Sequence, residues 1–219
     1  MKKNEIFHDG VDLTYGNTLT TNKETYSSTF DVLDRVLPGG GWPRVGITEI
    51  LIPTINANAL RFLIPALAEI SNKKWVVLVS PPYTPFSLAW GQAGADVSKI
   101  LVIDLPESDS SNRTNTLWAY EQALRFDDCG AALFWGDEMS TVELRKLYLA
   151  AEIGDTWGIV FRSAKFANYS SPASLRIQLD TLPPSKCHFT SNNLSTTKFK
   201  GTIIKGSSYS VGQQFLLEI

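Results

Sequence analysis

Short apolar runs alternate with stretches of helical periodicity through the middle of this 219-residue chain. The apolar runs have the length and composition of buried strands, and prolines or glycines follow several of them. Strands are expected at Ile47–Leu51, Trp75–Val79, Ile100–Ile103, Ala131–Trp135 and Thr156–Phe161. Strand and helix alternation at this spacing predicts an α/β layer built on a mainly parallel sheet.

Helices are expected between these strands, over Asn58–Ile70, Pro85–Gln92 and Thr116–Arg125. A further helix opens at Ser140, because a serine followed three residues later by a glutamate is a capping-box signature. Gly154 is expected to end that helix. The helices would cover the faces of the sheet.

The two ends of the chain depart from this alternation. Leu175–Leu179 alternates apolar and polar residues, and Lys198–Ile204 and Gln213–Ile219 have strand-like composition. These segments predict an antiparallel extension at the C-terminal side of the sheet. Residues 1–27 are rich in Thr, Asn, Lys and Glu and lack apolar periodicity, so we expect a flexible arm there and one α/β domain over residues 28–219.

Composition limits the classes of partner. Hydrophobic residues make up 43% of the chain, which is enough for a substantial core. The net charge of −2 excludes a strongly basic nucleic-acid footprint but is compatible with a local basic patch, and it leaves an indirect association with DNA open. No apolar run approaches the roughly 18–20 residues of a membrane span, and the first residues lack the apolar segment of a secretory signal. We expect a cytoplasmic protein with no membrane partner.

The segment Leu37–Leu60 has the composition of an approach to a phosphate-binding loop, with three glycines, a Trp-Pro turn and then an apolar strand. Such a loop needs glycines whose amides surround the phosphates, a lysine for charge and a Ser or Thr hydroxyl for magnesium. This chain keeps only Pro53 of that pattern, with Asn58 in place of the lysine and Ala59 in place of the hydroxyl. The sequence therefore predicts a degenerate nucleotide site and no bound cofactor.

Other catalytic or metal-binding patterns are weak. Neither histidine lies in an obvious base or ligand setting, and Cys129 and Cys187 lack metal-ligand spacing. Asp137 and Glu138 follow a predicted strand, but without the lysine and hydroxyl they are better explained as acids favoured at a helix start. We expect a protein that is not an enzyme and holds no metal.

The run Leu37–Arg44, followed by Thr48–Leu51, resembles the ImuA proteins, RecA-fold relatives associated with translesion DNA synthesis. Further segments match that family in the same order, so that the resemblance extends over residues 30–182. They are Val79–Tyr83, Ala93–Asp96, Leu117–Arg125, Cys129–Leu133, Leu149–Glu152 and Ser171–Arg176.

The ImuA resemblance implies a RecA-like α/β fold, with helices flanking a mainly parallel sheet and a degenerate phosphate loop. It also implies a function as a non-catalytic accessory protein of error-prone translesion synthesis in the SOS response to DNA damage. The implied partners are a Y-family polymerase-like subunit (ImuB), an error-prone polymerase III-type α subunit and RecA itself.

The central part of the chain is also similar to the SulA family, inhibitors of the division protein FtsZ, at Lys74-Trp75, Trp90–Ala93 and Lys99. SulA chains tend to lack the Gly-Gly-Gly-Trp entry, which favours ImuA as the main interpretation and leaves a SulA-type inhibitor that binds FtsZ as the alternative. The SulA match places Lys74, Trp90 and Lys99 in a partner-contact region, and these are the predicted partner-binding residues. Core packing is the alternative interpretation of Trp90.

Overall fold

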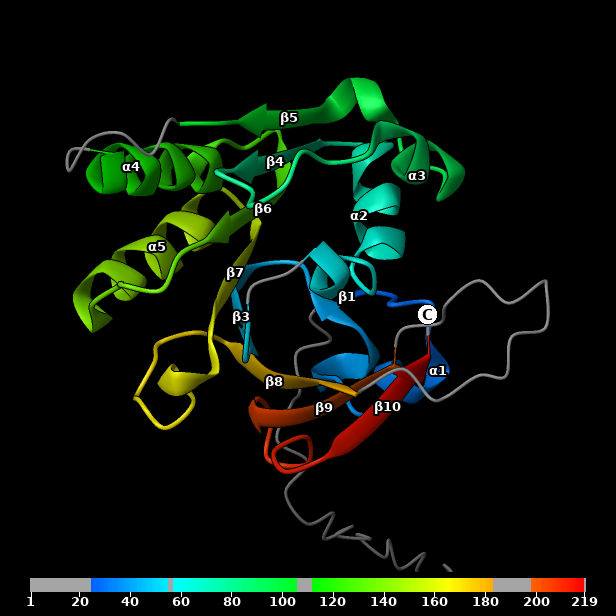
Figure 1. Cartoon of the computed structure of the whole chain (residues 1–219). Helices are drawn as coiled ribbons and strands as arrows, with labels where there is room; N and C mark the ends of the chain where they lie inside the picture. The colour runs from blue at the N-terminus through cyan, green and yellow to red at the C-terminus, as the bar shows by residue number, and fades with distance from the viewer. Residues whose placement is uncertain (1–24, 55–56, 106–111, 183–197, 219) are drawn as a thin grey trace, which may run out of the picture.

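The computed structural model describes residues 25–54, 57–105, 112–182 and 198–218. Its largest element is an eight-stranded mixed sheet in the order β10-β9-β8-β3-β7-β6-β4-β5 (Figure 1). The strands are β3 (Gly46–Ile52), β4 (Trp75–Val79), β5 (Ile100–Ile103), β6 (Cys129–Trp135), β7 (Trp157–Ser163), β8 (Leu175–Leu182), β9 (Lys198–Lys205) and β10 (Gln214–Glu218).

The sheet has a parallel part and an antiparallel part. Each neighbouring pair from β5 through β4, β6, β7 and β3 to β8 is parallel. Strands β9 and β10 are then added in antiparallel order. The parallel strands in the middle of the sheet are nearly continuous apolar runs because both of their faces are covered.

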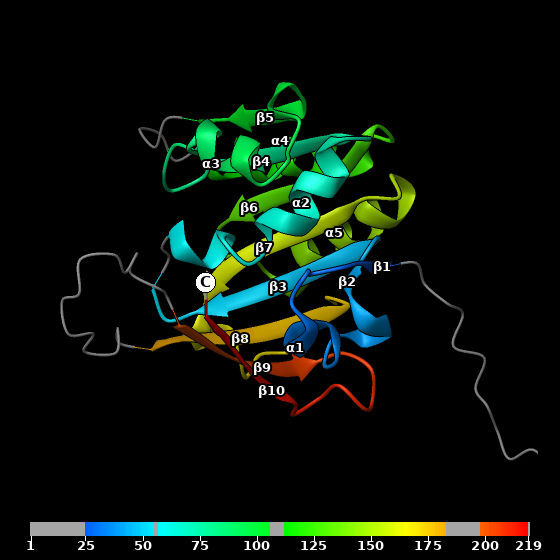
Figure 2. The same cartoon turned by 90° about the vertical axis from the view of Figure 1, so that its right-hand side faces the viewer.

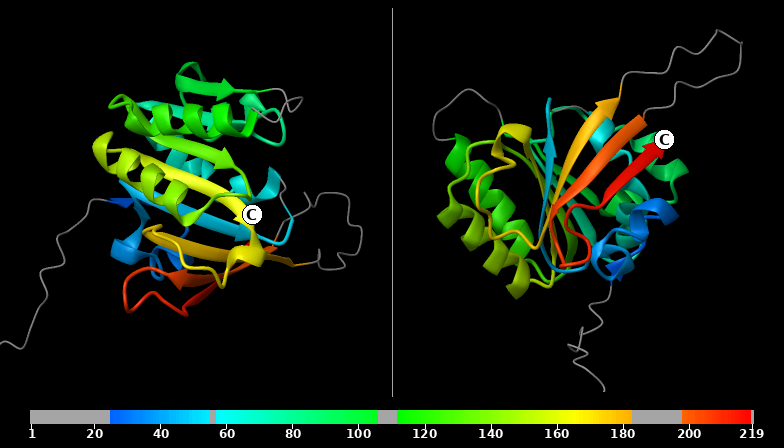
Figure 3. Two further views of the ribbon diagram at one scale, coloured as in Figure 1. Left: turned by 90° about the vertical axis from the view of Figure 1, so that its left-hand side faces the viewer. Right: turned by 90° about the horizontal axis from the view of Figure 1, so that it is seen from below.

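Helices lie on both faces of the sheet, as the view from below shows (Figure 3). One face carries α4 (Asn112–Arg125) and α5 (Thr141–Ile153). The opposite face carries α2 (Ile64–Ser71), with α3 (Ser87–Gln92) and α1 (Asp31–Asp34) farther out. The core therefore consists of two apolar clusters, one on each side of the sheet.

The Gly-rich segment near the N-terminus forms part of the core. Gly39 and Gly40 adopt positive φ angles of 77° and 79°, which glycine adopts without strain. Trp42 follows them, is fully buried, and stacks on Trp157 with ring centroids 5.4 Å apart. Trp42 also begins β2 (Trp42–Pro43), which pairs antiparallel with β1 (Thr25–Tyr26) in a separate two-stranded sheet. This segment is a turn that places an aromatic anchor.

The predicted capping box at the start of α5 is confirmed. The Glu143 amide donates to Ser140 Oγ at 3.2 Å, and the Ser140 amide donates to Glu143 Oε2 at 2.8 Å. Gly154 caps the C-terminus of the helix, as the sequence predicts. Local polar chemistry thus fixes both ends of α5.

The RecA-like architecture with a degenerate phosphate loop is a wrong prediction. The sheet is mixed, and the described chain after β3 makes a bend at Pro53-Thr54 and a 3-10 turn at Ala57–Leu60 before α2 begins at Ile64. Pro53 is exposed and Ala59 is buried in the core, whereas the side chain of Asn58 lies outside the described residues. Nothing in the described part of this segment identifies a phosphate-binding loop.

The predicted arm falls mainly on residues 1–24, which lie outside the described residues, and for these it stays a prediction. The expected arm also includes Thr25 and Tyr26, but these two residues pair with Pro43 and Trp42. The ring of Tyr26 also lies 6.2 Å from that of Trp157, centroid to centroid. The domain therefore includes residues from Thr25 onward.

A buried carboxylate joins three strands of the sheet. Glu49 in β3 is fully buried, and its Oε1 accepts from Arg162 Nη1 of β7 at 3.1 Å and from Ser171 Oγ at 2.9 Å. Its Oε2 accepts from Arg176 Nε of β8 at 2.5 Å. Arg176 also donates to the carbonyl of Phe166 at 2.8 Å, so the same network holds the loop between β7 and β8 over the sheet.

Removing the Glu49 carboxylate leaves two arginines buried without compensation. We expect Glu49→Ala to lower the free energy of unfolding by about 3–5 kcal/mol, the usual cost of breaking a buried ion pair from one side. The matched control is Glu69→Ala, which removes an exposed carboxylate paired with Lys73 and should cost at most about 1 kcal/mol. Urea denaturation measures both, and equal losses would contradict a structural role for Glu49.

Candidate functional site

The connection between β4 and β5 exposes apolar side chains at the carboxyl end of β4. It leaves the strand at Ser80, whose φ of 45° lies in the left-handed region that non-glycine residues rarely adopt. The chain then passes through Pro81-Pro82 into α3. Tyr83, Phe86 and Leu88 are all exposed along this connection, and Phe86 is the most exposed at 68%. Figure 2 shows α3 toward the end of the sheet to which the arrows of β4 and β5 point.

A pocket of about 180 Å³ opens beside these side chains. Carboxyl ends of parallel strands are where open α/β sheets usually bind ligands. Here the described lining carries no charged side chain, so the pocket suits an apolar group better than a phosphate. Its lining comes from the end of β4, the β4–β5 connection, the region before and within α2, and the end of β6. The lining residues are Leu60, Ile64, Leu78, Pro81, Pro82, Tyr83, Thr84, Pro85, Phe86, Ala89, Trp90 and Trp135.

Trp90 supports this connection from the inside. Trp90 is only 2% exposed and belongs to the larger core cluster. Its backbone carbonyl accepts hydrogen bonds from the amides of Ala93 and Ala95 at 3.1 and 3.0 Å. A direct partner contact by this ring requires exposure that Trp90 does not have. The alternative interpretation, that Trp90 is a core residue, matches its burial.

Lys99 and Lys74 lie at the opposite end of the strands. Lys99 directly precedes β5, and its Nζ donates to the carbonyl of Lys73 at 3.1 Å. Lys74 directly precedes β4, and its Nζ lies 4.0 Å from Asp155 Oδ2. The structure therefore brings the two lysines to one end of the sheet and does not bring them together with the apolar pocket. A partner-binding role for the three residues stays a prediction.

The C-terminal end of α2 fixes the position of the segment that carries Lys99. Ser71 Oγ accepts from the Asp96 amide at 2.9 Å, and Asn72 Nδ2 donates to the Gly94 carbonyl at 3.1 Å. The Asp96 carboxylate in turn accepts hydrogen bonds from the hydroxyl and the amide of Ser98. These hydrogen bonds lower the pKa of Asp96 below its usual value. The connection is thus rigidly attached at this end.

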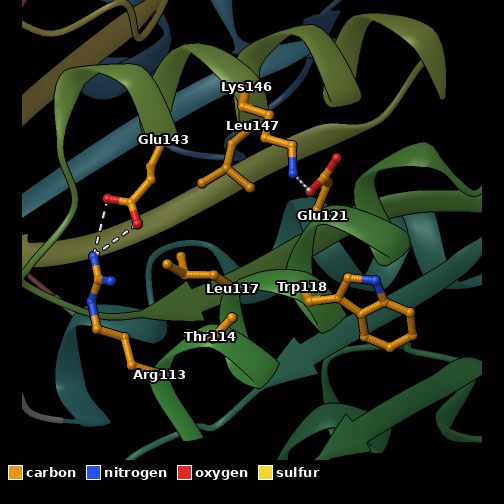
Figure 4. A pocket seen from close by; sticks show the side chains of 8 residues that line it. All are labelled: Arg113, Thr114, Leu117, Trp118, Glu121, Glu143, Lys146 and Leu147. Carbon is orange, nitrogen blue, oxygen red and sulfur yellow. Dashed lines mark hydrogen bonds and ion pairs between the residues drawn. The ribbon is translucent and has the colours of Figure 1, made fainter. Parts of the chain in front are cut away.

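A second pocket, of about 210 Å³, lies between α4 and α5 (Figure 4). Its charged side chains are already paired, Arg113 with Glu143 at 3.0 Å and Lys146 with Glu121 at 2.6 Å. Burial alone would raise the pKa of Glu121, but hydrogen bonds and charges from Lys146 and Arg125 together lower it. The pairs join two helices, and the pocket has no free charge among its described lining with which to recognise a ligand.

The carboxylate and thiol candidates from the sequence have structural roles. Asp137 is not at a helix start, because α5 begins only at Thr141. Its Oδ1 accepts a hydrogen bond from the Ser163 amide at 2.5 Å, and its Oδ2 forms an ion pair with Lys165 at 3.4 Å.

Burial raises the pKa of the Cys129 thiol to about 12, which makes it unreactive. Within the described ranges, no group of His, Cys, Asp and Glu could hold a metal ion. Cys187 lies outside them.

No family model matches the chain. Three curated proteins named cell division inhibitor SulA are similar to it. The protein from Serratia proteamaculans is 24% identical over 123 residues, which is 56% of this chain and 70% of the relative. The proteins from Yersinia enterocolitica and Serratia marcescens are 25% and 26% identical over 117 residues, which is 53% of this chain and 67% of each relative. The crystal structure of SulA from Pseudomonas aeruginosa matches with a TM-score of 0.43 and 22% identity, over 53% of this chain and 97% of that one.

These similarities correct the main interpretation of the sequence. They relate the chain to SulA cell division inhibitors, and they show no relation to ImuA. The translesion-synthesis function, with ImuB, a polymerase III-type α subunit and RecA as partners, is therefore wrong. The Gly-Gly-Gly-Trp entry had favoured ImuA, yet the buried Trp42 and the positive φ of Gly39 and Gly40 give it a purely structural explanation.

Two further expectations concern catalysis and the membrane. The relatives are named inhibitors of cell division, which agrees with a protein that is not an enzyme. In the part of the chain that the structure describes, no helix is long and apolar enough to cross a membrane.

The burial of Trp90 predicts a folding defect on truncation. We expect Trp90→Ala to lower the free energy of unfolding by about 3–5 kcal/mol, as for other buried aromatic residues. Ile153→Ala truncates an apolar side chain that is 67% exposed on α5 and serves as the control, with a change within about 0.5 kcal/mol. Chemical denaturation measures both, and a stable, fully folded Trp90→Ala variant would show that this ring is not part of the core.

Proposed function

We propose that this protein is a SulA-type inhibitor of cell division that acts by binding FtsZ. The observation that carries the proposal is the similarity to three SulA proteins over 117–123 residues, covering 67–70% of each relative. We infer FtsZ as the partner because the segments around Lys74, Trp90 and Lys99 resemble SulA proteins, which inhibit FtsZ. Catalysis is not needed for such a function, because occupancy of a surface is sufficient.

The mechanism follows from how polymers assemble. Subunits that associate head to tail through two different faces form open filaments. A protein that covers one of those faces removes the subunit from assembly, so inhibition requires roughly one inhibitor per subunit. Inhibition of this kind depends on the stoichiometry of the two proteins rather than on turnover.

The β4–β5 connection is the surface that we assign to FtsZ. Its exposed Tyr83, Phe86 and Leu88 surround an uncharged pocket, and aromatic side chains are enriched among the residues that dominate binding energy. Recognition is often carried by such connections when a rigid sheet positions them. Trp90 would hold α3 in place, whereas Lys74 and Lys99 would contribute charge at a distance and so affect the rate of association.

Sedimentation of FtsZ polymers in the presence of GTP tests this function. Addition of the full chain should reduce the FtsZ in the pellet in proportion to the amount added, until about one copy per subunit abolishes assembly. Unchanged pelleting at excess inhibitor would contradict the function itself.

A variant of Phe86 tests the surface separately. Phe86→Ser should weaken inhibition by about tenfold or more, because truncation of a central interface aromatic typically costs about 2 kcal/mol or more. Val142→Ser on α5 is the control, since Val142 is 79% exposed on the opposite face of the sheet, and it should inhibit like the parent. Equal inhibition by all three proteins would show that FtsZ contacts a different surface.

A further inference from the structure

The pocket beside α3 has rigid walls. Three of the five residues in Pro81–Pro85 are prolines, which fix their φ angles and leave this segment little freedom to lose on binding. Before this segment, the Ser80 amide donates to the Ile103 carbonyl at 2.8 Å. After α3, hydrogen bonds from Ser71 and Asn72 hold the chain that returns to β5. The pocket is therefore formed before a ligand arrives, and binding does not have to order its walls.

Aromatic rings form much of the lining. Trp90 is buried, and Trp135 stacks on Phe161 with ring centroids 4.9 Å apart and an angle of 7° between the ring planes. Tyr83 and Phe86 add two exposed rings. The described lining has no charged side chain. A charged group would therefore lose its hydration here without gaining a counter-ion, whereas an apolar group would only gain contacts.

The volume of the pocket fits one ring. It is about 180 Å³, close to that of an engineered apolar cavity of about 150 Å³ that holds one benzene molecule. Aromatic rings that meet with an offset or at an angle attract each other beyond the burial of their surfaces. An aromatic side chain also has only two torsions to fix, so its insertion costs little conformational entropy. These properties favour an aromatic group over a long flexible one.

We propose that this pocket receives one aromatic side chain of FtsZ when the two proteins associate. The inference rests on the function proposed above and adds the chemical class of the group that is bound. Tyr83 and Phe86 are exposed at the pocket, so they would pack around the inserted ring and exclude water from it. A desolvated aromatic group at the centre of an interface is the kind of contact that dominates binding energy.

Toluene, a small apolar ring, tests the pocket without FtsZ. In an NMR spectrum of the labelled full chain, it should shift the indole N–H signals of Trp90 and Trp135, which line the pocket. Trp118 is outside the described lining, so its indole signal reports binding elsewhere. Ala89→Leu enlarges a lining residue of α3 and should abolish both shifts. Ala93→Leu makes the same change at an exposed residue outside the described lining and should retain them.

Inhibition of FtsZ sedimentation by the same variants tests whether FtsZ occupies the pocket. Ala89→Leu should weaken inhibition by about tenfold or more, because loss of a central interface contact typically has an effect of this size. Ala93→Leu should inhibit like the parent. If Ala89→Leu does not fold, Thr84→Leu fills the pocket from the segment before α3 and should weaken inhibition in the same way.

Substitutions in FtsZ test the chemical class of the inserted group. Exposed aromatic residues of FtsZ are changed to serine one at a time, and binding of unpolymerised FtsZ is measured. One change should weaken binding to the parent by about tenfold or more and make little further difference to Ala89→Leu, because both changes remove the same contact.

Three results would overturn this inference and leave the proposed function intact. They are a parent whose Trp90 and Trp135 signals do not respond to toluene, full inhibition by a folded Ala89→Leu, and the absence of any aromatic residue of FtsZ that couples to the pocket. A parent that does not inhibit FtsZ would overturn both the inference and the proposed function.

Discussion

The Glu49 carboxylate accepts hydrogen bonds from Arg162 of β7 and from Arg176 of β8 at a site with no access to water. Its strand β3 lies between those two strands, next to the point where the sheet changes from parallel to antiparallel. Apolar packing is not directional. The charged hydrogen bonds to Glu49 therefore constrain where β8 and the loop before it can lie, because an unpaired arginine in this place would be costly.

A sheet fixed in this way supports the surfaces that project from it. The parallel strands place the β4–β5 connection at one end of the sheet, where Phe86 is exposed and Trp90 anchors the helix from below. The same connection returns to β5, whose outer edge is apolar and unpaired among the described strands. The FtsZ surface that we propose and the apolar edge of β5 are therefore distinct parts of one segment.

Much of the fold could be predicted from the sequence because its signals are local. Each apolar run expected as a parallel strand forms one. In β4 and β7, for example, the nearly continuous apolar composition by itself indicates a strand that is buried on both faces. The helix expected from Asn58 to Ile70 begins only at Ile64, because Pro65 is suited to a first turn and not to a helix interior.

The site was harder to predict, because exposure is decided by tertiary packing. Trp90 and Phe86 lie four residues apart on one short segment, and nothing local indicates which of them is buried. The Glu49 network left a signal that could have been used in two of its strands, because Glu49 and Arg162 are the single charged residues of mainly apolar strands. Arg176 gave no such signal, because its strand alternates apolar and polar residues. Only the strand order shows that the three meet.

The central claim is that this protein binds FtsZ, and titration of unpolymerised FtsZ with the purified chain tests it most directly. Fluorescence anisotropy of labelled FtsZ, followed in the presence of GDP so that no polymer forms, should rise and saturate at one copy of this protein per FtsZ subunit. The Phe86→Ser variant should shift the curve to higher concentration without changing its end point. An anisotropy that does not change at concentrations well above those of the two proteins in a dividing cell would contradict the account.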